Sequence, residues 1–96
     1  MPKRLIRISR ELSRELEELR FEPPTAYVYN PLEYARAPHE LYLARYGGGT
    51  KETLFVGMNP GPFGMAQSGV PFGDIPSVKS FLKIEAEVGR PANEHP

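Results

Sequence analysis

Apolar residues recur at helical spacing near the start of the chain and are separated mostly by charged residues. The apolar positions are Leu5, Ile8, Leu12, Leu16 and Leu19. Positions three and four apart share one face of a helix. We predict an amphipathic helix over residues 9–20 with Ser9 as its N-cap. We expect the apolar face of this helix to pack on the rest of the domain.

Two further helices follow from the same pattern and from capping residues. Asn30 and Pro31 predict a single helical turn, because asparagine favours the N-cap and proline the first helical position. A second helix is predicted from Pro38 to Tyr46, where Gly47 supplies the stop. Apolar residues at helical spacing predict a third helix over residues 77–83, and the tail beyond it reads as loop.

Residues 53–57 read Thr-Leu-Phe-Val-Gly, a short run that is apolar on both faces and rich in strand formers. Such a run is typical of a buried parallel strand. A parallel sheet needs further strands, each joined by a crossover. The pattern therefore predicts the first part of an α/β domain, with this one core strand present. We expect the chain to be truncated and its three central apolar residues to lack partners.

Composition narrows the function classes only a little. The chain has 96 residues, enough for one small domain, and its 12 basic and 12 acidic residues balance. No general affinity for polyanions follows from that charge. The absence of cysteine excludes disulfides and cysteine-ligated metal centres. No apolar run approaches the ~18 residues of a spanning helix, and no signal peptide is visible.

The run from Gly57 to Gly73 is the candidate site. It holds five of the nine glycines and three of the eleven prolines, and it presents Asn59 on a backbone stiffened by Pro60 and Pro62. Ligands of open α/β sheets bind beyond the carboxyl ends of strands, where this run lies. The amides that follow Pro62 are candidates for an anion-binding nest. A tight connection with an ordinary turn asparagine is the alternative, and the glycine spacing matches no phosphate-binding loop.

Two segments, Gly57-Met-Asn-Pro-Gly-Pro-Phe-Gly-Met-Ala-Gln67 and Gly69-Val-Pro-Phe-Gly73, resemble the first active-site motif of the single-strand-selective monofunctional uracil-DNA glycosylases. The likeness extends over roughly residues 27–96. It implies the N-terminal part of a three-layer α/β/α sandwich with a central parallel sheet. It also implies a division into an N-terminal helix and linker, residues 1–24, and the first part of a glycosylase domain, residues 25–96.

The resemblance implies a role for five residues around the base. Asn59 would position the water that attacks C1′ of deoxyuridine, and Phe72 would stack on the flipped base. Met58 and Gly61 would border C5 of the base, and backbone amides near Phe63 would line the pocket. For Phe72, packing in the core against the helix at 77–83 is the alternative. The chemistry needs no metal and no cofactor.

Partners and limits also follow from the resemblance. Gln67 and Ser68 would donate to DNA phosphates, in single- or double-stranded uracil-containing DNA. Arg45 and Lys51 add at most weak, salt-sensitive contacts, and ordinary surface charge is the simpler reading of each. We expect a monomer without membrane contact, cytoplasmic and nucleoid-associated in a bacterium or nuclear in a eukaryote.

The family's distal histidine and base-reading asparagine are expected beyond residue 96, so we expect no turnover from this chain alone. His39 reads as a capping or packing residue, and His95 matches an earlier Glu-His-Pro of the family. Two alternatives stay open: the same fold with a preference for xanthine or hypoxanthine, and a non-catalytic nucleic-acid-binding fragment.

Overall fold

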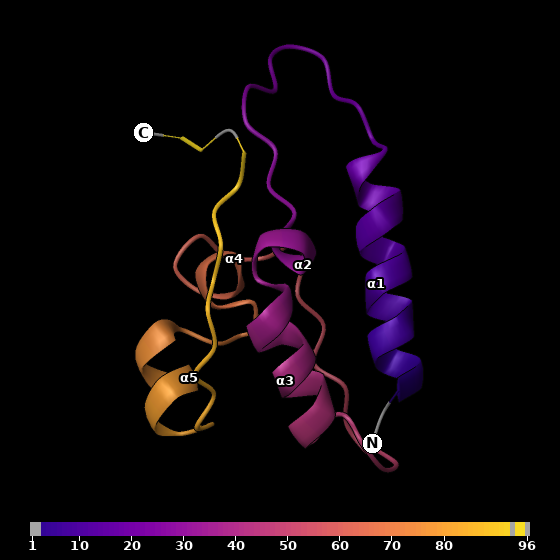
Figure 1. Cartoon of the computed structure of the whole chain (residues 1–96), viewed down its shortest axis with the longest axis vertical. Helices are drawn as coiled ribbons and strands as arrows, with labels where there is room; N and C mark the ends of the chain where they lie inside the picture. The colour runs from indigo at the N-terminus through magenta and orange to yellow at the C-terminus, as the bar shows by residue number, and fades with distance from the viewer. Residues whose placement is uncertain (1–2, 93, 96) are drawn as a thin grey trace.

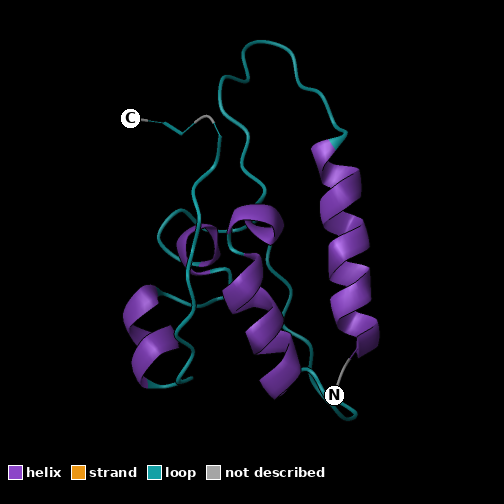
Figure 2. Cartoon of the chain, in the orientation of Figure 1, coloured by secondary structure: helices purple, strands orange, loops and turns teal. Residues whose placement is uncertain are grey.

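The computed structural model describes residues 3–92 and 94–95, and these residues form helices joined by long loops (Figures 1 and 2). The helices are α1 (Lys3–Glu17), α2 (Pro31–Tyr34), α3 (Arg36–Tyr46), α4 (Met65–Ser68) and α5 (Ile75–Ser80). None of the described helices is long and apolar enough to cross a membrane.

The predicted α/β class is wrong, because the described residues contain no strand. Residues 53–57 run as an irregular loop, without the hydrogen-bonded ladder that defines a sheet. Leu54, Phe55 and Val56 are 84%, 78% and 81% exposed, so they are not buried as core-strand side chains would be, and of the three the Phe55 ring has an aromatic contact, with Phe72. The physical reason is that strand propensity becomes a strand only where another strand accepts its hydrogen bonds. The three-layer sandwich with a central parallel sheet is therefore not the fold of this chain.

Helix α1 exists, but its predicted bounds and its predicted packing face are both wrong. It spans Lys3–Glu17 rather than 9–20, and Ser9 lies inside it rather than at its N-cap. The face against α2 and α3 is formed by Ser9 and Ser13, both buried. Small side chains let helices approach closely, whereas the apolar face lies to one side of this contact and stays largely exposed.

Polar contacts hold α1 against the rest of the chain. Arg10 donates from Nε and Nη2 to the two carboxylate oxygens of Glu40, at 2.7 and 2.8 Å. Asn30 donates to the Ser13 carbonyl at 3.1 Å and to the Glu17 carboxylate at 3.0 Å. A bidentate ion pair and a shared asparagine therefore fix the helix in place of a buried apolar seam.

The predicted turn after Asn30 is confirmed, and the same side chain links it to α1. Its Oδ1 accepts from the Leu32 amide at 3.2 Å, and Pro31 begins α2. Helix α3 begins at Arg36 and ends at Tyr46, with Gly47 at its C-cap, two residues longer at its start than predicted. A proline in the first helical turn, here at position 38, is compatible with that earlier start.

A small apolar core lies between α3, α4, α5 and the chain that follows. Its buried members are Val70, Val78 and Ile84, with partly buried Leu41, Tyr42 and Leu82 packed around them. Helix α5 begins two residues earlier than predicted because Asp74 caps it, accepting from the Ser77 amide at 3.3 Å. It also ends at Ser80, so Phe81 lies outside the helix and is exposed. The described part of the tail is loop, as predicted.

One glycine joins the candidate loop to this scaffold. Gly69 has φ +75°, and a Cβ there would lie 2.7 Å from the Ala35 carbonyl oxygen and 2.9 Å from the Ala35 Cβ. Only glycine meets both conditions without strain. The end of α4 therefore packs directly against the α2–α3 junction at Ala35, and this contact positions the candidate loop.

Candidate functional site

The loop at 57–73 borders a cavity of about 640 Å³, which we call the Phe72 cavity. Its lining is formed by Phe55, Val56, Gly57, Met58, Asn59, Pro60, Gly61, Gly64, Met65, Pro71, Phe72 and Asp74. Four residues predicted to surround a flipped base thus share one cavity: Asn59, Phe72, Met58 and Gly61. Phe63 is not among its lining residues.

Phe72 is held in a defined position although it is 70% exposed. Its ring meets the Phe55 ring edge to face, with centroids 6.4 Å apart and planes at 72°. A Cβ at Gly57 would lie 3.4 Å from two atoms of the Phe72 ring, so that ring rests on the Gly57 backbone. The ring is thus not part of the core, contrary to the alternative of packing on the helix at 77–83.

The backbone of Phe72 is itself unusual, with φ +59°. For a bulky residue this left-handed conformation costs about 1–2 kcal/mol. The turn that imposes it is closed by a bond from the Gly73 amide to the Val70 carbonyl, 2.9 Å long. Backbone strain that aims an exposed aromatic ring into a cavity is a reason to examine that residue for function.

A second, larger cavity of about 860 Å³, which we call the Tyr34 cavity, lies on the other side of Asn59 and Pro60, which line both. Its remaining lining residues are Tyr29, Tyr34, Pro62, Phe63, Ala66, Gln67, Val88, Gly89, Arg90, Pro91, Glu94 and His95. Phe63 and Gln67 thus lie across the Asn59–Pro60 segment from Phe72. Asn59 is the predicted site residue that reaches both spaces.

The Asn59 side chain is exposed, and its Nδ2 donates to the Pro60 carbonyl at 3.2 Å. That bond limits rotation of the amide by engaging the nitrogen. The amide oxygen is the group able to accept a hydrogen bond from a water molecule. Asparagine at this position can therefore orient a water without itself taking up a proton.

Tyr34 organises the Tyr34 cavity and was not singled out from the sequence. Its hydroxyl donates to the Ala66 carbonyl in α4, and its own carbonyl accepts from the Gly89 amide at 2.7 Å. Burial raises the pKa of the Tyr34 hydroxyl, with smaller contributions from Tyr29 and Glu94, so the group stays protonated and donates. Contacts this distant in sequence leave no local signal.

The two predicted phosphate-binding residues differ in their surroundings. Gln67 is exposed at the edge of the Tyr34 cavity. Ser68 is buried, and its hydroxyl donates to the Gly73 carbonyl while accepting from the Val70 amide at 3.1 Å. The Ser68 hydroxyl therefore closes the turn that carries Phe72. This structural role takes the place of a phosphate contact.

Three of the five backbone amides from Phe63 to Gln67, expected to form an anion-binding nest, are paired within the loop. The amides of Gly64 and Ala66 both donate to the Gly61 carbonyl, at 3.2 and 3.0 Å. The Gln67 amide donates to the Gly64 carbonyl at 2.9 Å. Donors already paired within the loop cannot also hold an anion. These bonds instead make residues 61–68 a compact turn between the two cavities.

The basic residues considered for DNA contact are paired with nearby carbonyls. Arg45 donates to the Lys83 carbonyl, and Lys51 donates to the Gly48 carbonyl at 2.6 Å. Both side chains are exposed, and neither residue lines the Phe72 or the Tyr34 cavity. The structure thus gives them local roles at the surface.

The two histidines have different surroundings. His39 is buried, and its Nδ1 lies 2.9 Å from the Gly69 carbonyl. A carbonyl oxygen only accepts, so Nδ1 carries the proton, which confirms the predicted packing role. The His95 ring packs edge to face on Tyr27, with centroids 4.9 Å apart. The described residues contain no group of three histidine, aspartate or glutamate side chains able to hold a metal ion.

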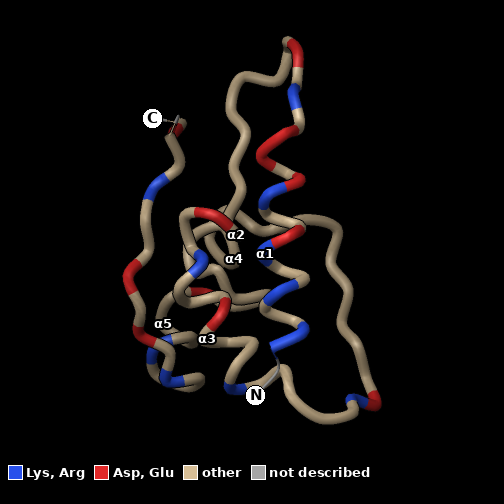
Figure 3. The backbone as a smooth tube through the Cα atoms, turned by 45° about the vertical axis from the view of Figure 1, so that its right-hand side comes forward, with Lys and Arg blue, Asp and Glu red and all other residues tan. Residues whose placement is uncertain are grey.

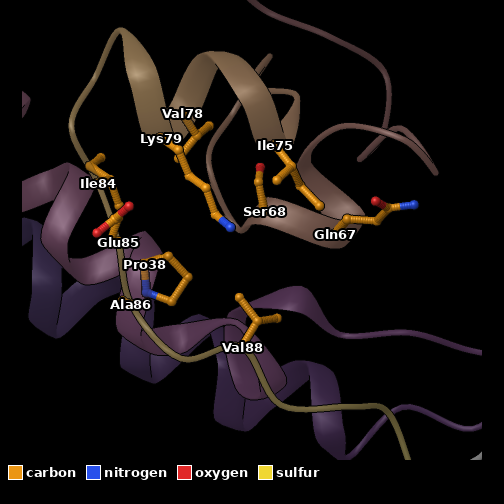
Figure 4. A pocket seen from close by; sticks show the side chains of 10 residues that line it. All are labelled: Pro38, Gln67, Ser68, Ile75, Val78, Lys79, Ile84, Glu85, Ala86 and Val88. Carbon is orange, nitrogen blue, oxygen red and sulfur yellow. The ribbon is translucent and has the colours of Figure 1, made fainter.

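A third cavity of about 190 Å³, shown in Figure 4, has neither Asn59 nor Phe72 among its lining residues. It is lined by Pro38, Gln67, Ser68, Ile75, Val78, Lys79, Ile84, Glu85, Ala86 and Val88. Val78 and Ile84 in this lining are members of the apolar core, and Lys79 and Glu85 are the charged residues among the described ones that line the cavity. We therefore place the candidate site at the two cavities that share Asn59.

Comparison with known proteins identifies relatives of the chain. No family model matches it. The single-strand selective monofunctional uracil-DNA glycosylase of Rattus norvegicus is 53% identical over 85 residues, which cover 88% of this chain and 31% of the relative. The proteins of that name from Mus musculus and Bos taurus are each 52% identical over 85 residues, covering 30% and 31% of their lengths.

Identity of this level over most of the chain confirms the resemblance found at residues 57–73. The chain spans less than a third of the length of the curated relatives it matches. Over 88% of its length the chain is thus similar to proteins named single-strand-selective monofunctional uracil-DNA glycosylases, and it matches about 30% of each of them.

Proposed function

We propose that this chain supplies the water-positioning and base-stacking part of an enzyme that hydrolyses the N-glycosidic bond of uracil in DNA, with 5-hydroxymethyluracil as a second substrate. The observation that carries the proposal is that Asn59 and Phe72 line one cavity together with Met58 and Gly61. The activity is known here only from the names of the relatives, and this chain matches about 31% of the rat protein. The residue roles below are therefore part of the proposal.

The reaction breaks the bond between C1′ of the sugar and N1 of uracil, and the bonding electrons leave with the base. The sugar then carries oxocarbenium character, and a water oxygen forms the new bond to C1′. The proton that the water loses neutralises the uracil anion, so the products are neutral uracil and an abasic sugar. Such a step requires an oriented water more than a strong base. The Asn59 side chain is held by its bond to the Pro60 carbonyl, and its amide oxygen provides the acceptor for a hydrogen bond from that water.

Phe72 provides the surface on which the flipped base rests. Extruding a nucleotide costs a few kcal/mol, and stacking on an aromatic ring returns about 1–3 kcal/mol. The ring is exposed and already braced by Phe55 and Gly57, so little side-chain freedom remains to be lost on binding. Stacking does not distinguish uracil from cytosine, so base choice requires groups outside this cavity.

Gln67 and Phe63 serve the DNA strand rather than the base in this proposal. Both line the Tyr34 cavity, on the other side of the Asn59–Pro60 segment from Phe72. An exposed glutamine amide can donate to a phosphate oxygen, and an exposed aromatic ring can contact sugar or base. Ser68 is left out of this role because its hydroxyl is buried and paired.

A chimera tests the proposal within a whole protein. The matching 85 residues of the rat relative are replaced by those of this chain, and uracil release is measured on single- and double-stranded oligonucleotides. We expect the chimera to release uracil, and Asn59→Ala to slow the single-turnover rate at least about 100-fold while leaving oligonucleotide affinity nearly unchanged. Phe72→Ala should mainly weaken binding.

Arg14→Ala on the charged face of α1 is the matched control and should behave as the parent chimera. An Asn59→Ala rate equal to the parent's would contradict the assigned role. Oligonucleotides with xanthine or hypoxanthine in place of uracil measure base preference with the same protein. The isolated 96-residue chain is expected to show no turnover, and uracil release by it would overturn that expectation.

A further inference from the structure

The tail that follows α5 supplies one edge of the Tyr34 cavity. The chain beyond residue 84 carries charges of both signs (Figure 3), and Arg90 is the one lysine or arginine in that stretch of the sequence. Among the described residues that line the Tyr34 cavity, Arg90 and Glu94 are the pair of opposite charge. The described lining of the Phe72 cavity holds neither lysine nor arginine. Arg90 is therefore the arginine available at the two cavities that share Asn59.

Two hydrogen bonds hold the backbone on either side of Arg90. Before it, the Gly89 amide donates to the Tyr34 carbonyl at 2.7 Å. After it, the His95 amide donates to the Tyr29 hydroxyl at 2.6 Å. An anchored backbone fixes the place from which the side chain extends, so a ligand that binds Arg90 has little more than that side chain to order.

The guanidinium of Arg90 has one ion-pair partner in the described part of the chain. Its Nη1 donates to the Glu94 carboxylate at 3.1 Å, and the two side chains are 82% and 47% exposed. A guanidinium has five N–H donors, and this contact engages one of its nitrogens. Exposed ion pairs of this kind contribute little to stability, so a stronger anion can displace Glu94 at small cost.

We propose that Arg90 binds a phosphate of the DNA strand beside the flipped nucleotide, and that Glu94 holds the guanidinium in place until that phosphate displaces it. The inference rests on the proposed function, in which the base lies on Phe72 and C1′ of its sugar lies at Asn59. Because the phosphates are bonded to the same sugar, the strand continues on the side of Asn59 away from Phe72, at the Tyr34 cavity. The planar guanidinium fork matches two phosphate oxygens.

The lining of the Tyr34 cavity favours a nucleic acid strand over a buried protein segment. Beside Arg90 it presents the exposed rings of Phe63 and Tyr29 and the exposed amide of Gln67. Aromatic rings along a basic groove are the common arrangement of surfaces that bind single strands. A protein segment packed over the cavity would bury the guanidinium, which is costly unless its donors are all paired. A strand supplies the opposite charge and leaves the groove open to water.

The chimera with the rat relative tests the role of Arg90. The enzyme concentration that gives half the maximal single-turnover rate is measured on a single-stranded uracil oligonucleotide. We expect Arg90→Ala to raise it about 3- to 10-fold at low salt and to change the maximal rate by less than about twofold, since a phosphate contact serves ground and transition states alike. The slope of log affinity against log salt should shrink by about 0.7, the value for one phosphate on a single strand. Arg90→Lys keeps the charge and should keep most of that slope.

Glu94→Gln should have the opposite effect and strengthen binding about 2- to 5-fold, because it removes a competing acceptor and a charge that repels the phosphate. Arg14→Ala and Glu18→Gln are the matched controls. That pair is exposed, has the same spacing of four residues and lines neither the Phe72 nor the Tyr34 cavity. Both control variants should keep the affinity and the salt slope of the parent chimera.

The outcomes separate this inference from the proposed function. If Arg90→Ala keeps the parental affinity and salt slope while Asn59→Ala still slows uracil release, the inference is overturned and the proposed function stands. An Arg90→Ala variant that unfolds at a lower temperature with an unchanged salt slope would also overturn it, because the rest of the protein then packs on the guanidinium. A parent chimera without uracil release would contradict the proposed function. Fluorescence anisotropy with the same oligonucleotide then tests the Arg90 contact alone, and unchanged affinity of Arg90→Ala would overturn it.

Discussion

The ring of Phe72 rests on the backbone of Gly57, with two ring atoms 3.4 Å from the point that a Gly57 Cβ would occupy. The contact joins the two ends of the candidate loop across the Phe72 cavity. It also means that the position of the Phe72 ring depends on the absence of a side chain at Gly57, fifteen residues away in sequence. Four predictions test this and three other contacts.

Gly57→Val should displace the Phe72 ring, because a branched side chain needs the space that the ring occupies. In the chimera we expect affinity for uracil-containing single-stranded DNA to fall by about 5- to 10-fold, a large part of one stacking interaction. Fluorescence anisotropy with a labelled oligonucleotide measures the change. Gly48→Val is the control, since no atom lies within 4 Å of a Cβ there. Equal affinities for the two variants would contradict the contact.

Gly69→Ala should destabilise the fold by about 2–4 kcal/mol, since left-handed backbone strain adds to a clash with the Ala35 carbonyl. Gly49→Ala is matched to it, because Gly49 has almost the same φ, +76°, but open space around it. The control should lose only the ~1–2 kcal/mol of backbone strain. Urea unfolding of both variants isolates the steric part. Identical losses would show that the Gly69–Ala35 approach is unimportant.

The Arg10–Glu40 pair should make the docking of α1 sensitive to acid. The hydrogen bond from Arg10 lowers the pKa of Glu40, against a smaller opposing effect of burial. Because the folded-state pKa is below that of the unfolded chain, ionised Glu40 stabilises the fold above the ordinary glutamate pKa of about 4.3. That contribution is lost as the pH falls through the lowered, folded-state value.

Glu40→Gln should therefore lower stability at neutral pH and flatten its decline in acid, as followed by thermal unfolding at a series of pH values. Some acid sensitivity will remain, because bonds from Ser77 also lower the pKa of Asp74. Glu18→Gln, in the exposed pair with Arg14, is the control and should leave the profile nearly unchanged. If the stability of Glu40→Gln declined with falling pH in parallel with that of the parent, the Arg10–Glu40 pair would not be the source of the acid sensitivity.

Ser68→Ala should reduce stability by about 1–3 kcal/mol, because it leaves the buried Gly73 carbonyl and Val70 amide without this partner. Its effect on DNA affinity should not vary with salt. Gln67→Ala should show the opposite profile, with stability preserved and affinity weakened. Denaturant unfolding and oligonucleotide titrations measure the two effects. A salt-dependent loss of affinity in Ser68→Ala would return this residue to the phosphate contacts.

Local chemistry placed several elements correctly. Asn30 with Pro31 specified the turn at α2, because an asparagine N-cap and a proline at the first position need only their neighbours. Gly47 marked the end of α3 for the same reason. The missed start of α5 reflects a residue that lies outside the predicted span and caps the helix. That residue is Asp74, which starts α5 before the apolar pattern begins.

For the candidate site as well, some features followed from the sequence and others only from the tertiary structure. The sequence by itself revealed the similarity to the glycosylases. It also identified the run that carries Asn59 and Phe72, because glycine, proline and asparagine at fixed spacing constrain the backbone locally. Only the tertiary structure decided that these two residues share a cavity. It also assigned the Ser68 hydroxyl to the Gly73 carbonyl and the Tyr34 hydroxyl to the Ala66 carbonyl.

The faces of the elements were likewise decided in three dimensions. Periodicity determined that α1 is amphipathic, but burial depends on what lies opposite, and α2 and α3 meet its serine face. Strand propensity at residues 53–57 is a property of the sequence, whereas a sheet requires hydrogen bonds from a second strand. The sequence thus determined which segments favour helix or extended backbone, and contacts between distant segments decided which surfaces are buried.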